Sequence, residues 1–169
     1  MTPTQPGTIL GIDYGSRRVG VAIAESDGFA ARPLTTIELG RHSSEVGDAA
    51  VAEPDARTVA ELARLVAQHG VTELVVGLPL DAHGGQGSMA VTARSWAEAL
   101  GAALQLPVTL RDERLTSSIA ESRLGPMPRG RSGGPPSRTQ RDRYRGRVDR
   151  EAAAIILQDE LDARRSERR

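Results

Sequence analysis

The sequence contains no cysteine and no lysine, and aromatic residues make up only 2% of its 169 residues. Without cysteine, disulfides and thiolate metal sites are excluded, so a bound metal must be held by oxygen or imidazole ligands. This favours magnesium or manganese over zinc. The N-terminus does not have the pattern of a secretory signal, and no apolar run of about 18 residues could cross a bilayer. We therefore expect a single cytoplasmic domain over residues 1–169 with no membrane partner.

Charge is distributed unevenly along a chain whose formal net charge is zero. Residues 1–100 carry seven Arg and twelve acidic residues, whereas residues 101–169 carry fifteen Arg and ten acidic residues. Eight of those Arg lie between Arg129 and Arg150, against two Asp. A biased genome composition explains the missing lysine better than it explains this local cluster. Because a guanidinium group binds phosphate through a planar fork, the cluster suits a polyanion.

Hydrophobic periodicity predicts three strands followed by alternating helices and strands. The first two strands flank a hairpin turn at residues 14–18. The later elements are a strand at Pro33–Leu39, a helix at Ala56–His69, a strand at Glu73–Leu78, a helix at Met89–Leu104, a strand at Pro107–Arg111, a helix at Thr116–Leu124 and a helix from about Val148 to Arg165. This order predicts an α/β fold, with a mixed five-stranded sheet of three antiparallel strands and then parallel strands, and helices on both faces. Trp96, on one helix face, is expected in the core.

Residues 125–147 contain four Pro and five Gly but hardly any apolar residue. Such a composition cannot form a core, so we expect this Arg-, Pro- and Gly-rich segment to be mobile and to precede the last helix. Tyr144 is the aromatic residue best placed in it to stack on a base.

Three acidic positions from distant parts of the chain predict a metal site. Asp13 ends the first strand, Asp112 and Glu113 follow the last strand, and Asp149 lies on the inward face of the final helix. Ligand sites form at the carboxyl ends of strands in such a sheet, and paired divalent ions there can clamp a phosphodiester. Other roles remain open, since Asp13 could bind the hairpin turn and Asp149 could be an N-cap. Spacing does not choose between Asp112 and Glu113, which face opposite sides of a strand.

Residues near these acids are weaker candidates. Arg17 and Arg18, in the turn after Asp13, either contact phosphates or are solvated surface charges. The glycine-rich residues 84–87 precede a helix and could offer backbone amides to a phosphate, although they match no established phosphate motif. His83 is better interpreted as a surface residue than as a proton shuttle.

Four motifs in order make the chain resemble the YqgF family, which comprises bacterial Holliday junction resolvase-like proteins also described as pre-16S rRNA nucleases. The motifs are GIDYGSRRVGVA (Gly11 to Ala22), VVGLPL (Val75 to Leu80), DERLTS (Asp112 to Ser117) and VDREAAAIILQ (Val148 to Gln158). The resemblance covers nearly the whole chain. It implies an RNase H-like fold, with Asp13, Glu113 and Asp149 as catalytic residues and ligands of magnesium or manganese. The chemistry of paired divalent ions makes two ions the expectation.

The same resemblance implies a nuclease that acts on nucleic acid, either a structured RNA precursor at the 5′ end of 16S rRNA or, as the competing assignment, branched DNA at a Holliday junction. The chain departs from the family's pattern in its long Arg-, Pro- and Gly-rich insertion before Asp149. The candidate contacts to nucleic acid are Arg17, Arg18, Arg114, Arg141, Arg143, Arg145 and Arg147.

Two other classes of function are compatible with parts of the sequence. Actin-related ATPases and sugar kinases share the strand, Asp, turn and strand pattern at residues 11–21, but they need a second copy of this unit, and 169 residues leave no room for one. In a binding module without catalysis, the acids would be structural and the Arg segment would bind the polymer. Either a monomer or a homodimer is expected, and symmetric cutting of a junction would require the dimer.

Overall fold

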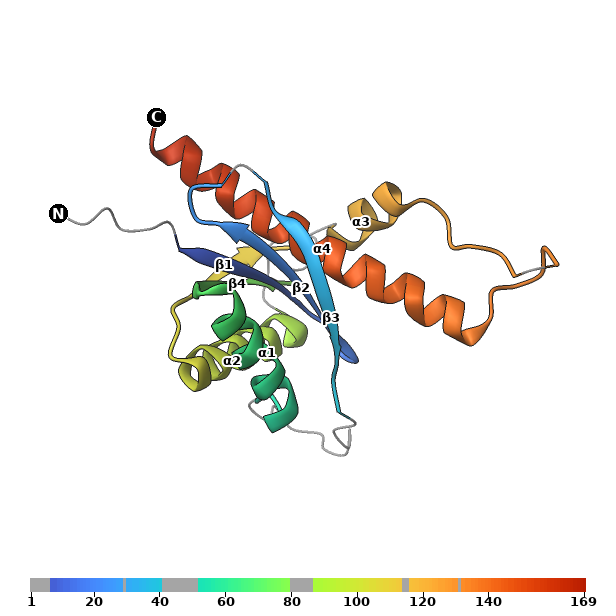
Figure 1. The fold of residues 1–169 in the computed structure, drawn as a ribbon, viewed down its shortest axis with the longest axis horizontal. Helices are drawn as coiled ribbons and strands as arrows, with labels where there is room; N and C mark the ends of the chain where they lie inside the picture. The colour runs from blue at the N-terminus through green and yellow to red at the C-terminus, as the bar shows by residue number, and fades with distance from the viewer. Residues whose placement is uncertain (1–6, 29, 41–51, 80–86, 114–115, 131) are drawn as a thin grey trace.

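The structure is a computed structural model that describes residues 7–28, 30–40, 52–79, 87–113, 116–130 and 132–169. Within these ranges one five-stranded sheet is flanked by helices (Figure 1). The strands are β1 (Thr8–Tyr14), β2 (Arg18–Glu25), β3 (Arg32–Glu38), β4 (Val71–Leu78) and β5 (Val108–Asp112). The helices are α1 (Ala56–His69), α2 (Ser88–Leu104), α3 (Thr116–Leu124) and α4 (Arg138–Glu167).

The sheet has the mixed topology predicted from the sequence. Its strand order is β3-β2-β1-β4-β5. The first three strands pair antiparallel, whereas β1 with β4 and β4 with β5 pair parallel. The carboxyl ends of β1, β4 and β5 therefore meet at one edge of the sheet, where Asp13 and Glu113 lie.

One face of the sheet forms the larger core together with α1 and α2. Alternate residues of β1, β2 and β4 point toward these helices, and Trp96 of α2 is 2% exposed, as predicted. Its ring stacks on Tyr14 at a centroid distance of 4.5 Å. Helix α1 begins at an N-cap in which Asp55 accepts a hydrogen bond from the Thr58 amide, and it ends at Gly70 in the left-handed conformation.

The opposite face of the sheet carries small residues and is covered by α4. A Cβ atom at Gly11 would lie 2.6 Å from Leu157 Cβ, and one at Gly20 would lie 2.0 Å from the carbonyl oxygen of Asp149. Side chains cannot approach so closely, so glycine at these positions is what lets the helix lie directly on the strands. This close contact brings Asp149 to the sheet.

Ion pairs anchor the C-terminal half of α4 to β4 and β5. Arg164 binds Glu73 of β4 and Glu160 within the helix, and Arg111 of β5 also binds Glu160 at 3.3 Å. These ion pairs fix the position of α4 along the sheet. No helix in the described part of the chain is long and apolar enough to cross a membrane.

The predicted start of the last helix at Val148 is wrong, because α4 begins at Arg138. Ser137 caps the helix in a capping box with Gln140, which accounts for the earlier start. The second half of the segment 125–147 is thus helical. Tyr144, Val148, Ala152 and Ile155 of α4 pack with Ala120 of α3 into a small separate core. In Figure 1 this N-terminal part of α4, drawn in orange, extends beyond the strands.

Candidate active site

Asp13 and Glu113 converge at the carboxyl ends of β1 and β5. Asp13 shares the face of β1 that bears Ile9 and Gly11, which is the face toward α4. On β5, Arg111 also points toward α4, so Glu113 two residues later lies on the same face and Asp112 on the opposite one. The question left open by the sequence is thereby answered: Glu113, not Asp112, faces Asp13.

The backbone of Glu113 is held by two neighbouring elements. Its amide donates to the carbonyl of Leu78 at the end of β4, at 3.2 Å. Its carbonyl accepts from both the amide and the hydroxyl of Thr116, at 3.1 and 2.7 Å, where α3 begins. There is no room beside the side chain, since a Cβ atom at Gly77 would lie 2.2 Å from Glu113 Oε2. The position of this carboxyl group is therefore set by β4 and α3 together.

The pKa values of both carboxyl groups are raised. Burial, the charge of Asp13 and a hydrogen bond to it raise the pKa of Glu113 to about 9. Burial and the charge of Asp149 raise the pKa of Asp13 to about 6, although the hydrogen bond from Glu113 acts against that rise. Glu113 Oε2 is nevertheless buried without a hydrogen-bond partner. Two adjacent carboxyl groups with an unpaired oxygen need either a proton or a cation between them.

Asp149 is the third acid, and it comes from well inside α4. It is not the N-cap of the helix, because Ser137 has that role. Gly20, the residue paired with Asp13 across β1 and β2, lets the backbone of Asp149 lie against the sheet. The charge of Asp149 acts on the pKa of Asp13, which places the two carboxyl groups in the same neighbourhood.

Arg18 is the partner of Asp149. Its Nε lies 2.7 Å from Asp149 Oδ2, and the two side chains are only 13% and 25% exposed. While this bond lasts, a cation approaching Asp149 would have to use Oδ1. The sequence leaves Arg18 open between a phosphate contact and a solvated surface charge, and nothing in the spacing of the motifs signals its pairing with a residue 131 positions away.

These residues fit a site for hard divalent cations. Carboxylate oxygens are the ligands that magnesium and manganese prefer, and the buried, unpaired Glu113 Oε2 is such an oxygen. Among the described residues no three acidic or histidine side chains are already grouped closely enough to hold an ion. The geometry thus offers a close pair, Asp13 and Glu113, with Asp149 turned toward Arg18.

The candidate contacts to nucleic acid lie in different surroundings. Arg17 is exposed in the turn before β2, and Arg141, Arg143, Arg145 and Arg147 are exposed on α4. The expectation that Tyr144 stacks on a base is wrong, because its ring is buried and its hydroxyl donates to the Gly125 carbonyl at 2.7 Å. Arg114, His83 and the glycine-rich residues 84–86 lie outside the described residues.

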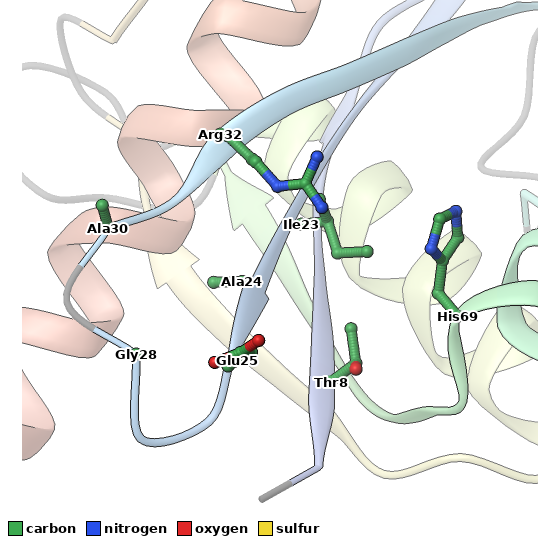
Figure 2. A pocket seen from close by; sticks show the side chains of 8 residues that line it. All are labelled: Thr8, Ile23, Ala24, Glu25, Gly28, Ala30, Arg32 and His69. Carbon is green, nitrogen blue, oxygen red and sulfur yellow. The ribbon is translucent and has the colours of Figure 1, made fainter.

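A cavity of about 390 Å³ lies away from the acids, at the opposite end of the sheet. Figure 2 shows Thr8 at the start of β1 and Glu25 at the end of β2 among its lining residues, with Arg32 and His69. Asp13 lies at the other end of β1, so this cavity is not part of the candidate active site.

The fold and the paired carboxyl groups define an α/β domain of the RNase H-like class. The solved structure of Thermus thermophilus RuvC in complex with a Holliday junction substrate has the same fold, with a TM-score of 0.51 at 16% identity over 95% of this chain and 96% of that chain. More specifically, the chain belongs to the RuvX family, described as Holliday junction resolvase, whose sequence profile matches residues 7–163. This confirms the resemblance to the YqgF family.

Relatives of known sequence agree with this family. A protein of Chloroflexus aggregans is 43% identical over 159 residues, covering 94% of this chain and 96% of the relative. One from Anaeromyxobacter dehalogenans is 42% identical over 155 residues, covering 92% and 96%. Both are named as proposed pre-16S rRNA nucleases. The family and its relatives are nucleases by name, so the protein is a hydrolase of phosphodiester bonds.

Proposed function

We propose that the protein is a divalent-metal-dependent nuclease that trims the 5′ end of the 16S rRNA precursor, with Asp13, Glu113 and Asp149 as its catalytic acids and metal ligands. The observation that carries the proposal is the half-buried Asp13–Glu113 pair, with the buried and unpaired Glu113 Oε2, at the carboxyl edge of the sheet. The RNA substrate is proposed from the names of the relatives, which match at 42–43% identity.

Three groups of residues in the chain would bind the metal ions, orient the ligands and leave space for them. Asp13 and Glu113 would hold magnesium or manganese, preferably two ions, with Asp149 as the third ligand. When bound, such ions would polarise the scissile phosphate and activate the attacking water. Arg18 holds one oxygen of Asp149, which fixes the direction of this side chain. Gly77 and Gly20 leave the space in which Glu113 and Asp149 approach the sheet.

Replacement of each acid tests the proposal. Asp13→Asn, Glu113→Gln and Asp149→Asn are expected to lower the rate of cleavage of a 16S precursor fragment by at least about 100-fold in magnesium or manganese, since each removes a charged ligand. Asp112→Asn is the matched control. It removes an equivalent charge next to Glu113 but on the opposite face of the strand, so activity should stay within severalfold. Full activity of Asp13→Asn would refute the proposal.

A Holliday junction is the second candidate substrate, favoured by the description of the family. Resolution requires two symmetric cuts and hence a homodimer, whereas trimming of RNA is possible for a monomer. The precursor fragment and a four-way DNA junction should be compared at the same salt concentration, because affinity for either polyanion falls steeply with ionic strength. Paired cuts in the junction by a dimer, without cleavage of the precursor, would reverse the order of the two candidates.

A further inference from the structure

The arginines at the start of α4 point in two directions around the helix. Successive residues of an α-helix are turned by about 100°, so positions can be compared with the direction of Asp149. Arg138, Arg141 and Arg145 lie within about 20–80° of that direction. Arg143 and Arg147 lie about 120–160° away from it. We call the first set the site-side row and the second set the outer row.

Two contacts fix the rotation of the helix, so these directions are determined. On one side Tyr144 is buried against α3 and donates to the carbonyl of Gly125. On another side the Gly146 carbonyl accepts a hydrogen bond from Thr36 of β3 at 2.7 Å. Asp149, one turn later, lies against Gly20 of β2. A helix held on both sides cannot rotate to exchange its two rows of arginines.

All five arginines are exposed, and none of them forms an ion pair with another residue in the described ranges. Asp142 lies within about 20° of the direction of Asp149, so the site-side sector carries a net charge of about +2, the same as the outer row. The amount of charge therefore does not distinguish the two rows. The two rows differ in their direction relative to the acidic residues of the site.

We propose that the site-side row, Arg138, Arg141 and Arg145, is a phosphate track that guides one strand of a polynucleotide along α4 to the carboxyl groups. Along the helix axis these residues precede Asp149 by about 16, 12 and 6 Å, so their guanidinium groups form a series of positive charges that leads to the site. Isolated guanidinium groups with no acidic partner bind phosphate without reading sequence. The outer row adds only general electrostatic attraction.

This inference rests on the proposed nuclease function, because it assigns the track to the substrate of that site. It goes further by separating arginines that the sequence places in one undivided cluster. The sequence does not distinguish Arg141 and Arg145 from Arg143 and Arg147.

Two double variants test the track with equal loss of charge. Arg141→Gln with Arg145→Gln removes two site-side arginines, and Arg143→Gln with Arg147→Gln removes two outer ones from the same turns of the helix. Binding of a fluorescent RNA hairpin with a single-stranded 5′ extension is measured in EDTA between about 50 and 200 mM salt. The site-side variant should reduce the salt slope by about two contacts, and the outer variant by less than one.

Three controls separate the effect of arginine position on RNA binding from effects of charge, folding and substrate. Arg141→Lys with Arg145→Lys preserves the charge and should keep most of the salt slope, and circular dichroism should show the same helix content for all variants. A four-way DNA junction used in the same assay should give the same ranking, because phosphate contacts do not read sequence. Equal losses for the two rows, or a larger loss for the outer row, would overturn the proposal. Binding in EDTA is independent of cleavage, so failure of the nuclease proposal would be seen separately, in the acid variants.

Discussion

At the scale of single residues, the Asp13–Glu113 pair lowers the stability of the folded protein. Two half-buried carboxyl groups lie together, and one of their oxygens, Glu113 Oε2, is buried with no hydrogen-bond partner among the described residues. Such an arrangement costs free energy in the absence of a cation, because burial disfavours the charged forms. Strongly perturbed acids of this kind mark sites selected for chemistry rather than for stability.

Glu113→Gln should stabilise the metal-free protein at neutral and alkaline pH. Between the ordinary pKa of 4.5 and the raised value of about 9, the folded state holds a proton that the unfolded state has lost. Unfolding then releases a proton, so stability falls as pH rises through this range. The variant removes this dependence and should gain about 1–3 kcal/mol at pH 8. Thermal unfolding in EDTA from pH 5 to 9 measures it. Asp112→Asn is the control: it removes only the smallest of the causes that raise the pKa of Glu113, so it should change the slope far less than Glu113→Gln.

Gly20→Ala should damage the site through Asp149. The added methyl group would meet the backbone of Asp149 at 2.0 Å, so α4 would have to move away from β2. Overpacking of this kind costs about 1–3 kcal/mol, and the cleavage rate should fall more than the stability loss explains. Gly134→Ala, where no atom lies within 4 Å, is the control. Wild-type activity of a well-folded Gly20→Ala would show that the position of Asp149 is not critical.

At the scale of elements, sequence patterns located the strands and shorter helices but misjudged α4. The helix at Ala56–His69 has the predicted bounds, because its apolar spacing and terminal Gly70 are strong signals. The start of α4 was missed because Arg, Gly and Pro dominate residues 125–147. The signal was nevertheless present: Ser137 and Gln140 have the spacing of a capping box. The contact of Tyr144 with α3 is tertiary, so composition could not reveal it.

Tyr144 should determine whether the site-side row is held in place. Tyr144→Ala removes a buried ring from the small core between α3 and α4, which should cost about 3 kcal/mol. Tyr144→Phe loses only the hydrogen bond to Gly125, at about 1 kcal/mol. Hydrogen exchange should show faster opening at residues 138–146 in the Ala variant, with weaker RNA binding. If RNA affinity were retained despite the faster exchange, an ordered helix would not be needed for binding.

At the scale of the whole molecule, the sequence predicted which elements would meet but not how their side chains would pair. The predicted strand order and parallel pairing explain why Asp13 and Glu113 lie at the same edge of the sheet. The sequence motifs identified Asp149 as the third candidate acid. The Arg18–Asp149 pair and the steric role of Gly20 depend on how α4 crosses the sheet. That crossing is fixed by the ion pairs of Arg164 at the far end of the helix, and periodicity contains no information about them.

Because the proposed metal site joins β1, β5 and α4, ion binding should stabilise the whole domain. A ligand at 100 times its dissociation constant stabilises the folded state by about 2.7 kcal/mol. Because the pKa values of Asp13 and Glu113 are raised, an ion must compete with protons for these carboxyl groups, so the rise in Tm with manganese should be larger at pH 8 than at pH 6. Asp13→Asn should abolish this rise, whereas Asp112→Asn should retain it. A manganese effect of equal size at both pH values would mean that the ion binds away from the carboxyl pair.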